Sequence, residues 1–217
     1  MRGDLELIAT LINPGARILD LGCGEGELLD HLQRVKSVNG YGLDRNAENI
    51  RICVSKGVNV IEQDLDEGLN NFVNSSFDMV VMTDALQAVK EPRKLIREML
   101  RIGDECIVTF PNFAHWRCRA QLALKGVMPI SEQLPHSWFD TPNIHLCTFA
   151  DFEQLCMAES INIIQRRVVD ANHQEKTFIN WAPNFFDDRR VVPKFLHDDF
   201  QMSRVNPHPV GSKNDVL

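Results

Sequence analysis

Residues 16–26, ARILDLGCGEG, constrain the fold of this chain more than any other segment. Ile18, Leu19 and Leu21 form a short apolar run of the kind found in a buried parallel strand. Three glycines follow at alternate positions: Gly22, Gly24 and Gly26. Glycine permits positive φ and lets the backbone approach a ligand closely, and a helix that starts there directs its first N–H groups at the ligand. The segment therefore predicts a nucleotide-type binding loop.

The sequence of this turn excludes two common nucleotide-binding loops. A phosphate-binding P-loop ends in Gly-Lys-Ser/Thr, which this turn lacks. A dinucleotide fingerprint places its third glycine later than Gly26, to fit a pyrophosphate. Asp20, near the end of the strand, favours a ligand with a positive group. The pattern resembles the first motif of the class I S-adenosylmethionine (SAM) methyltransferases. That resemblance implies that the turn, Cys23 included, holds the amino-acid end of SAM.

Two acids follow the next predicted strands at positions that this resemblance assigns to the cofactor. Residues 38–43 predict a second strand, and Asp44 at its carboxyl end can accept both hydroxyls of a ribose. Residues 60–61 predict a third strand, followed by Asp64 and Leu65. In the methyltransferases the acid here accepts the adenine amino group and its apolar neighbour packs on the ring. The alternative is that both acids only cap helices or turns. Together with the glycine turn they predict a site for SAM or S-adenosylhomocysteine.

Strands and helices alternate along the chain, which predicts an α/β fold with a doubly wound, mostly parallel sheet and three αβα layers. The resemblance to the SAM methyltransferases implies that this is the Rossmann-like class I SAM-methyltransferase fold. Residues 77–82 are almost wholly apolar and predict a central strand, so the segment 83–87 just beyond it, which starts with Thr83, should face SAM and the substrate. Residues 106–110 and 161–169 predict two further strands. The fold normally adds an antiparallel seventh, but the candidate at 190–193 contains a proline that does not suit a long strand.

We expect a single domain over residues 1–197 and a flexible tail over 198–217. Segment 126–147 has no clear periodicity, is rich in proline, histidine and aromatic residues, and is long for a plain connection. Such segments are commonly lids or binding loops. Thr148 predicts the N-cap of the helix that follows, and the apolar stretch 181–186 is expected to pack on the sheet.

Composition narrows the class of partner and the compartment. A net charge of −7 without basic runs argues against binding to nucleic acid or an acidic membrane. The six cysteines form no CxxC pair, which predicts reduced, mostly buried thiols in a cytoplasmic protein without a metal framework. Acidic residues interrupt the short apolar run near the N-terminus, which argues against a signal peptide or membrane anchor.

A narrower resemblance extends from about residue 4 to 186, where the chain is similar to the methionine biosynthesis protein MetW family. The motifs that carry it are DLGCGEGELL at 20–29, the acidic turn at 64–66, FPNFAHWRCRAQL at 110–122 and DTPNIHLCTFADFEQLC at 140–156. The last of these is the most specific. The resemblance implies a place in methionine biosynthesis and a partnership with homoserine O-acyltransferase, which activates homoserine for sulfur incorporation.

Methyl transfer to oxygen or nitrogen usually needs a general base in addition to the cofactor. The candidates on predicted loops at the carboxyl edge of the sheet are His145, our first choice, and His115, His136 and Asp84. The alternative for each histidine is that it only orders its loop. No Asn-Pro-Pro-aromatic signature follows the fourth predicted strand, so methylation of DNA or peptide amides is not expected.

Two functions therefore remain open. The first is a SAM-binding accessory subunit of homoserine O-acyltransferase, and the second is a small-molecule methyltransferase whose acceptor is covered by the 126–147 loop. An exposed apolar patch with Trp116, Trp138 and Phe139 would favour the first function, because such patches mark partner surfaces. A closed pocket under the loop would favour the second. These aromatic residues could equally belong to the core.

Overall fold

The computed structural model describes residues 3–130, 134–169 and 190–197. Its strands are β1 (Arg17–Leu21), β2 (Asn39–Asp44), β3 (Asn59–Glu62), β4 (Phe77–Thr83), β5 (Gly103–Pro111), β6 (Ile161–Val169) and β7 (Arg190–His197). Its helices are α1 (Gly3–Thr10), α2 (Glu27–Lys36), α3 (Ala47–Ser55), α4 (Pro92–Ile102), α5 (Trp116–Lys125) and α6 (Phe149–Ala158). Two short 3₁₀ turns are η1 (Leu65–Glu67) and η2 (Leu86–Ala88).

The strands form one seven-stranded sheet in the order β3-β2-β1-β4-β5-β7-β6. Strands β1 to β5 pair in parallel, and β7 runs antiparallel to both of its neighbours. The strand order reverses between β1 and β4, and ligands of open α/β sheets bind beyond the carboxyl ends of the strands at such a point. The predicted doubly wound, mostly parallel sheet is therefore confirmed.

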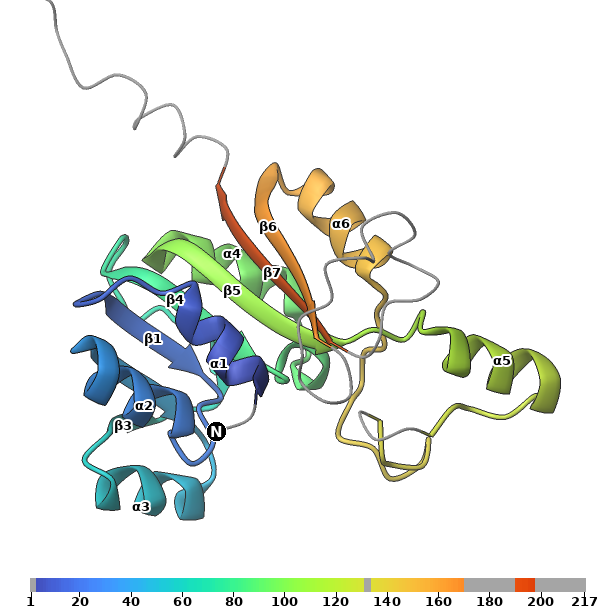
Figure 1. Cartoon of the computed structure of the whole chain (residues 1–217), viewed down its shortest axis with the longest axis horizontal. Helices are drawn as coiled ribbons and strands as arrows, with labels where there is room; N and C mark the ends of the chain where they lie inside the picture. The colour runs from blue at the N-terminus through green and yellow to red at the C-terminus, as the bar shows by residue number, and fades with distance from the viewer. Residues whose placement is uncertain (1–2, 131–133, 170–189, 198–217) are drawn as a thin grey trace, which may run out of the picture.

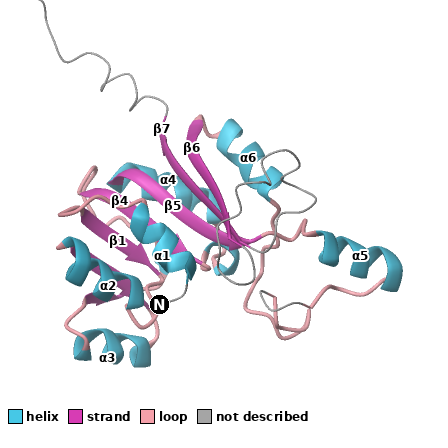
Figure 2. Cartoon of the chain, viewed as in Figure 1, coloured by secondary structure: helices cyan, strands magenta, loops and turns pink. Residues whose placement is uncertain are grey.

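Helices cover both faces of the sheet, which gives the three predicted layers (Figures 1 and 2). Successive side chains of β1 point to opposite faces, as the strand period requires. Ile18 packs with the apolar residues of α1 and α2, whereas Leu19 and Leu21 pack with those of α4 and α6. Asp20 shares its face of β1 with Ile18, so its carboxyl group is directed toward the α1–α2 side of the buried core.

The doubt about a seventh strand was wrong, because β7 extends over eight residues and lies between β5 and β6. Pro193 has no N–H to donate, and its pairing with β5 is interrupted around it. The paired residues are Ile107 with Lys194 and then Phe110 with Val191. On the other side a register shift in β6 between Ile163 and Gln165 accommodates the irregularity. The pairing with β5 is thus interrupted at Pro193, whereas the pairing with β6 includes it, opposite Arg166.

Two smaller predictions are confirmed. Thr148 caps α6 in a reciprocal capping box, in which its hydroxyl accepts from the Asp151 N–H and the Asp151 carboxylate accepts from the Thr148 N–H. All six cysteines are free, and all but Cys147 are buried. The stretch at 181–186 and the tail at 198–217 lie outside the described residues.

Gly26 is the N-cap residue of α2 with φ 72°, and a methyl group on it would come within 2.9 Å of the Cys53 sulfur. Gly15 has the same φ, but a methyl group there would meet no heavy atom within 4 Å. Left-handed backbone costs a non-glycine residue about 1–2 kcal/mol, and overpacking adds about 1–3 kcal/mol. We therefore expect Gly26→Ala to lower the free energy of unfolding clearly more than Gly15→Ala does in urea denaturation. Equal losses would show that the Cys53 contact is easily relaxed.

Candidate functional site

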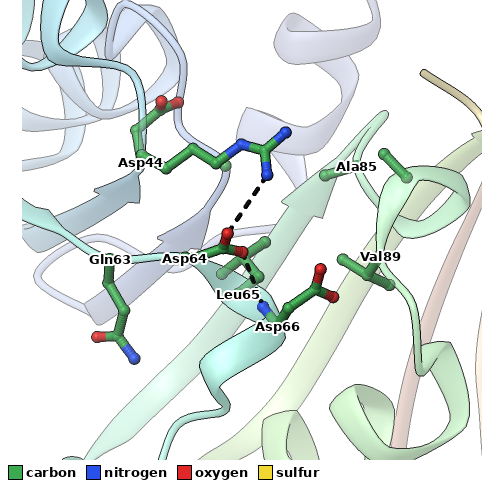
Figure 3. A pocket seen from close by; sticks show the side chains of 10 residues that line it. Asp44, Gln63, Asp64, Leu65, Asp66, Ala85 and Val89 are labelled. Carbon is green, nitrogen blue, oxygen red and sulfur yellow. Dashed lines mark hydrogen bonds and ion pairs between the residues drawn. The ribbon is translucent and has the colours of Figure 1, made fainter.

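A pocket opens at the carboxyl edge of the sheet, beside the point where the strand order reverses (Figure 3). Its lining comes from the glycine turn after β1, from the ends of β2 and β3, and from the segment after β4. The lining residues are Gly22, Asp44, Arg45, Gln63, Asp64, Leu65, Asp66, Ala85, Ala88 and Val89. The predicted switch-point location of the site therefore coincides with a pocket.

Backbone hydrogen bonds hold the glycine turn against the end of β2. The N–H groups of Gly22 and Cys23 donate to the Leu43 carbonyl at 2.8 and 2.9 Å. Gly22 has φ 72°, and a methyl group on it would lie 3.2 Å from the Cβ of Ala85 across the pocket floor. A methyl group on Gly24 would meet no heavy atom within 4 Å, so open space lies above the turn. The turn is thus a cradle that side chains would fill.

Asp44 fixes the turn and the start of α3 together. Its Oδ2 accepts from the Gly24 N–H at 2.9 Å, and its Oδ1 accepts from the Asn46 N–H at 2.8 Å and from Asn49 Nδ2 at 3.2 Å. An ionised carboxylate offers about four acceptor positions, so these three contacts leave one for a ligand hydroxyl. Asp44 lines the pocket at the position predicted for a ribose-binding acid.

Asp64 also lines the pocket, and both of its oxygens are engaged. Oδ1 accepts from the Asp66 N–H at 3.0 Å, and Oδ2 lies 3.3 Å from Arg45 Nη1 (Figure 3). The hydrogen bond from Asp66, and then the Arg45 guanidinium, lower the pKa of Asp64, so that it is ionised at neutral pH. The Asp66 carboxylate in turn accepts from the Lys90 N–H at 2.8 Å, which ties the β3 side of the pocket to the η2 side.

Asp20 is 1% exposed, and its Oδ1 has no hydrogen-bond partner among the residues that the structure describes. Burial raises the pKa of Asp20 to about 7, and the nearby negative charge of Asp44 adds to the shift. An unpartnered buried carboxyl group carries a large free-energy penalty when it ionises. A cationic group bound at the glycine turn would relieve that penalty, so the site fits a positively charged ligand.

Asp20 and four other predicted cofactor residues are not among the lining residues of the pocket: Cys23, Gly24, Gly26 and Thr83. The Cys23 side chain is buried against Gly42, where a methyl group would come within 2.4 Å of its sulfur, and burial raises the pKa of the thiol. Gly24 and Gly26 both have positive φ in the turn, 55° and 72°, and Thr83 is half-buried at the end of β4. Their predicted roles in cofactor binding remain predictions.

None of the four candidate bases is among the lining residues of the pocket. Asp84 directly follows β4 with φ 52°, and its N–H donates to the Thr109 hydroxyl at 3.0 Å. His115 is buried at the start of α5, with its ring 5.8 Å from that of Trp116. His145 and His136 are exposed. Asp84 alone among these four adjoins a pocket-lining residue in the sequence, and a catalytic role stays a prediction for all of them.

Sequence reasoning missed several pocket residues. Arg45 directly follows Asp44, and a guanidinium one residue beyond a predicted ligand was an available signal. Gln63 and Asp66 flank the predicted Asp64–Leu65 pair. Ala85 lies within the segment 83–87 that was expected to face the ligand, and it lines the pocket. Ala88 and Val89 lie beyond that segment and carry no chemical signal, so only the fold shows their position.

No cluster of three or more histidine, cysteine or acidic side chains in residues 3–130, 134–169 and 190–197 has an arrangement that could hold a metal ion. Within these same ranges, no helix combines the length and the apolar character that crossing a membrane requires.

The strand order of the sheet and the glycine turn after β1 are those of the class I SAM-dependent methyltransferase fold. A SAM-dependent methyltransferase from Mesorhizobium loti superimposes with a TM-score of 0.63 at 16% identity, over 89% of this chain and 97% of that chain. The [4+2]-cyclase SpnF superimposes with a TM-score of 0.62 at 18% identity, over 89% of this chain and 80% of that chain. Because one of these similar structures is a cyclase, the fold by itself does not define the reaction.

The family model described as methionine biosynthesis protein MetW matches residues 2–192, and the chain belongs to this family. It is similar to the bifunctional methionine biosynthesis protein MetXA/MetW of Rhodopirellula baltica, with 31% identity over 198 residues. The match covers 87% of this chain and 32% of that protein. The chain thus spans about a third of the length of this curated relative.

Proposed function

We propose that this chain is a SAM-binding accessory subunit that binds and supports a homoserine O-acyltransferase in methionine biosynthesis. The observation that carries the SAM half of the proposal is the buried Oδ1 of Asp20, which has no hydrogen-bond partner among the described residues and closely precedes an open glycine turn in the chain. SAM carries a sulfonium and an ammonium group, either of which supplies the missing positive charge. An anionic dinucleotide would place like charge beside Asp20 and Asp44.

The other pocket residues suit the remaining parts of the same ligand. Asp44 keeps an acceptor position open for a ribose hydroxyl. Asp64 is ionised and can accept from the adenine amino group, once Arg45 moves or shares it. Leu65 offers an apolar surface for the ring. S-adenosylhomocysteine has the same groups apart from the sulfonium methyl, so it would use the same contacts.

The acyltransferase half rests on the relative that combines MetXA and MetW in one polypeptide. Covalent fusion keeps two proteins at a high effective concentration, which is useful when they act together. The exposure of Trp116, Trp138 and Phe139 also supports this half, because a surface of that kind fits a protein partner.

One observation favours the second candidate, a small-molecule methyltransferase. The Asp84 carboxylate lies 3.5 Å from the Thr109 hydroxyl, directly beyond β4 and one residue from pocket-lining Ala85. A carboxylate at that place could accept a proton from an oxygen or nitrogen acceptor. Release of S-adenosylhomocysteine that depends on an added acceptor would identify this activity.

The test measures the rate of a purified homoserine O-acyltransferase with and without this chain, at several SAM concentrations. We expect the rate to respond to SAM about fivefold or more, and only when the wild-type chain is present. Addition of the Asp44→Ala chain should remove the response to SAM. An acyltransferase rate that is indifferent to the chain at every SAM concentration would contradict the accessory function.

A further inference from the structure

Helix α5 and the connection after it form a projection beside the sheet, which we call the arm and define as residues 116–130 and 134–146 (Figure 1). Helix α5 buries only Cys118, so it covers almost none of the core. Ten of the sixteen large apolar side chains that are exposed in the described residues belong to the arm. They are Trp116, Leu122, Leu124, Val127, Met128, Ile130, Trp138, Phe139, Ile144 and Leu146.

This concentration distinguishes the arm from the other described residues, where the six remaining exposed large apolar side chains are spread along the sequence. Trp138 and Phe139 are each 74% exposed, and their rings meet edge to face at 5.7 Å. Single exposed apolar residues are normal on soluble proteins, whereas a large contiguous set marks an interaction site. Large aromatic side chains also contribute disproportionately to binding energy at protein interfaces.

The charge of α5 indicates what kind of surface fits the arm. The helix carries Arg117, Arg119 and Lys125 and no acidic residue, although the whole chain has a net charge of −7. In a symmetric dimer the same patch faces itself, so these cations would be brought together. A partner with an apolar patch bordered by acidic residues is complementary, and a second copy of this chain is not.

Residues 144–145, which we call the root of the arm, are hydrogen-bonded to the η2 segment beside the pocket. The N–H groups of Ile144 and His145 both donate to the Gln87 carbonyl, at 2.9 and 3.0 Å. His145 Nε2 lies 3.3 Å from the Lys90 carbonyl. Gln87 belongs to η2, and its neighbour Ala88 lines the pocket. A ligand that displaces this wall therefore displaces the root of the arm as well.

We propose that the arm is the surface on which homoserine O-acyltransferase docks, and that its root on η2 couples docking to occupancy of the pocket. This inference rests on the proposed function for the identity of the partner. The exposed aromatic pair Trp138–Phe139 forms the apolar centre of the interface, and the cations of α5 form its rim. The fusion in the Rhodopirellula baltica relative supports this occupant, because it keeps a MetXA portion next to a MetW portion.

The test compares two double variants in a titration of the acyltransferase into the full chain. Trp138→Ser with Phe139→Ser removes the centre of the arm, and Val54→Ser with Val73→Ser removes two exposed apolar side chains elsewhere. We expect the arm variant to bind the acyltransferase about 30-fold more weakly than wild type and the control variant to bind within twofold. SAM affinity in the absence of the partner should be unchanged in both variants, which shows that each is folded.

The outcomes separate this inference from the function on which it rests. A complex that forms equally well with the arm variant overturns the docking surface and leaves the accessory function standing. Failure of the wild-type chain to bind the acyltransferase overturns both. A wild-type chain that is dimeric on its own, and monomeric as the arm variant, overturns the choice of partner, since a second copy would then cover the arm.

Discussion

Replacing Asp44 with alanine is expected to weaken SAM binding about 100-fold. The carboxylate holds the Gly24 N–H and the start of α3, and it would also accept a ribose hydroxyl. A hydrogen bond to a charged group contributes about 1.5–3 kcal/mol, so losing the ribose contact and loosening the turn together account for two orders of magnitude. Calorimetric titration of SAM into the wild-type and Asp44→Ala chains measures the difference.

Asp78→Ala provides a matched control for the loss of a hydrogen-bonded carboxylate. Asp78 lies near the amino end of β4 and accepts from the backbone N–H, Nε and Nη2 of Arg17, at 2.7, 3.1 and 2.6 Å. Those contacts are at the edge of the sheet opposite the pocket. We expect the control variant to bind SAM within twofold of wild type. Wild-type affinity in the Asp44→Ala chain would contradict the assignment of the pocket.

SAM affinity is expected to rise about tenfold per pH unit between pH 5 and 7 and to level off above pH 7. The reason is that Asp20 is protonated in the free protein below its pKa of about 7, and must lose that proton to meet a cationic ligand. The α-amino group of the ligand stays protonated throughout this window. Titrations at pH 5, 6, 7 and 8 in one buffer system measure the slope.

The control ligand is 5′-methylthioadenosine, which lacks the amino-acid end, and the control variant is Asp20→Asn, which cannot titrate. In both controls the binding affinity should not change between pH 5 and 7.

The same group affects folding stability. In the wild-type chain without ligand, the Asp20 carboxyl group binds more protons in the folded state than in the unfolded state between pH 4 and 7. The contribution of Asp20 to stability is therefore present below pH 4 and is lost as the pH rises through 7. If SAM affinity rose with pH as steeply in the Asp20→Asn chain as in wild type, the proposed role of Asp20 in ligand binding would be contradicted.

The order of strands and helices was predictable because each strand is a short apolar run and each crossover helix carries its own apolar stripe. The seventh strand was not predictable in the same way. Pro193 argued against a long strand at this place in the sequence. Only the structure shows that the pairing with β5 is interrupted at the proline and that the register of β6 shifts nearby. The general disfavour of proline within strands was outweighed here by the pairing of β7 with both of its neighbours.

The acids of the candidate site were predictable because each one follows a strand whose carboxyl end reaches the same edge of the sheet. Asp44 and Asp64 both line the pocket, and so does Leu65, the predicted apolar neighbour of Asp64. The opposite wall was predictable only in part. Ala85 lies in the segment 83–87 expected beyond the fourth strand, whereas Ala88 and Val89 carry no chemical signal of their own. Nothing in the sequence indicates that the arm root is hydrogen-bonded to Gln87, since this contact joins residues far apart in the chain.

The most direct test of coupling between the pocket and a partner is a calorimetric titration of SAM into the chain alone and into its mixture with homoserine O-acyltransferase. We predict binding in both cases, with affinities that differ about fivefold or more, because a coupling free energy between two sites acts equally in both directions. Equal SAM affinities in the presence of a formed complex would contradict the coupling. Absence of SAM binding in both titrations would contradict the assignment of the glycine turn and its acids as a SAM site.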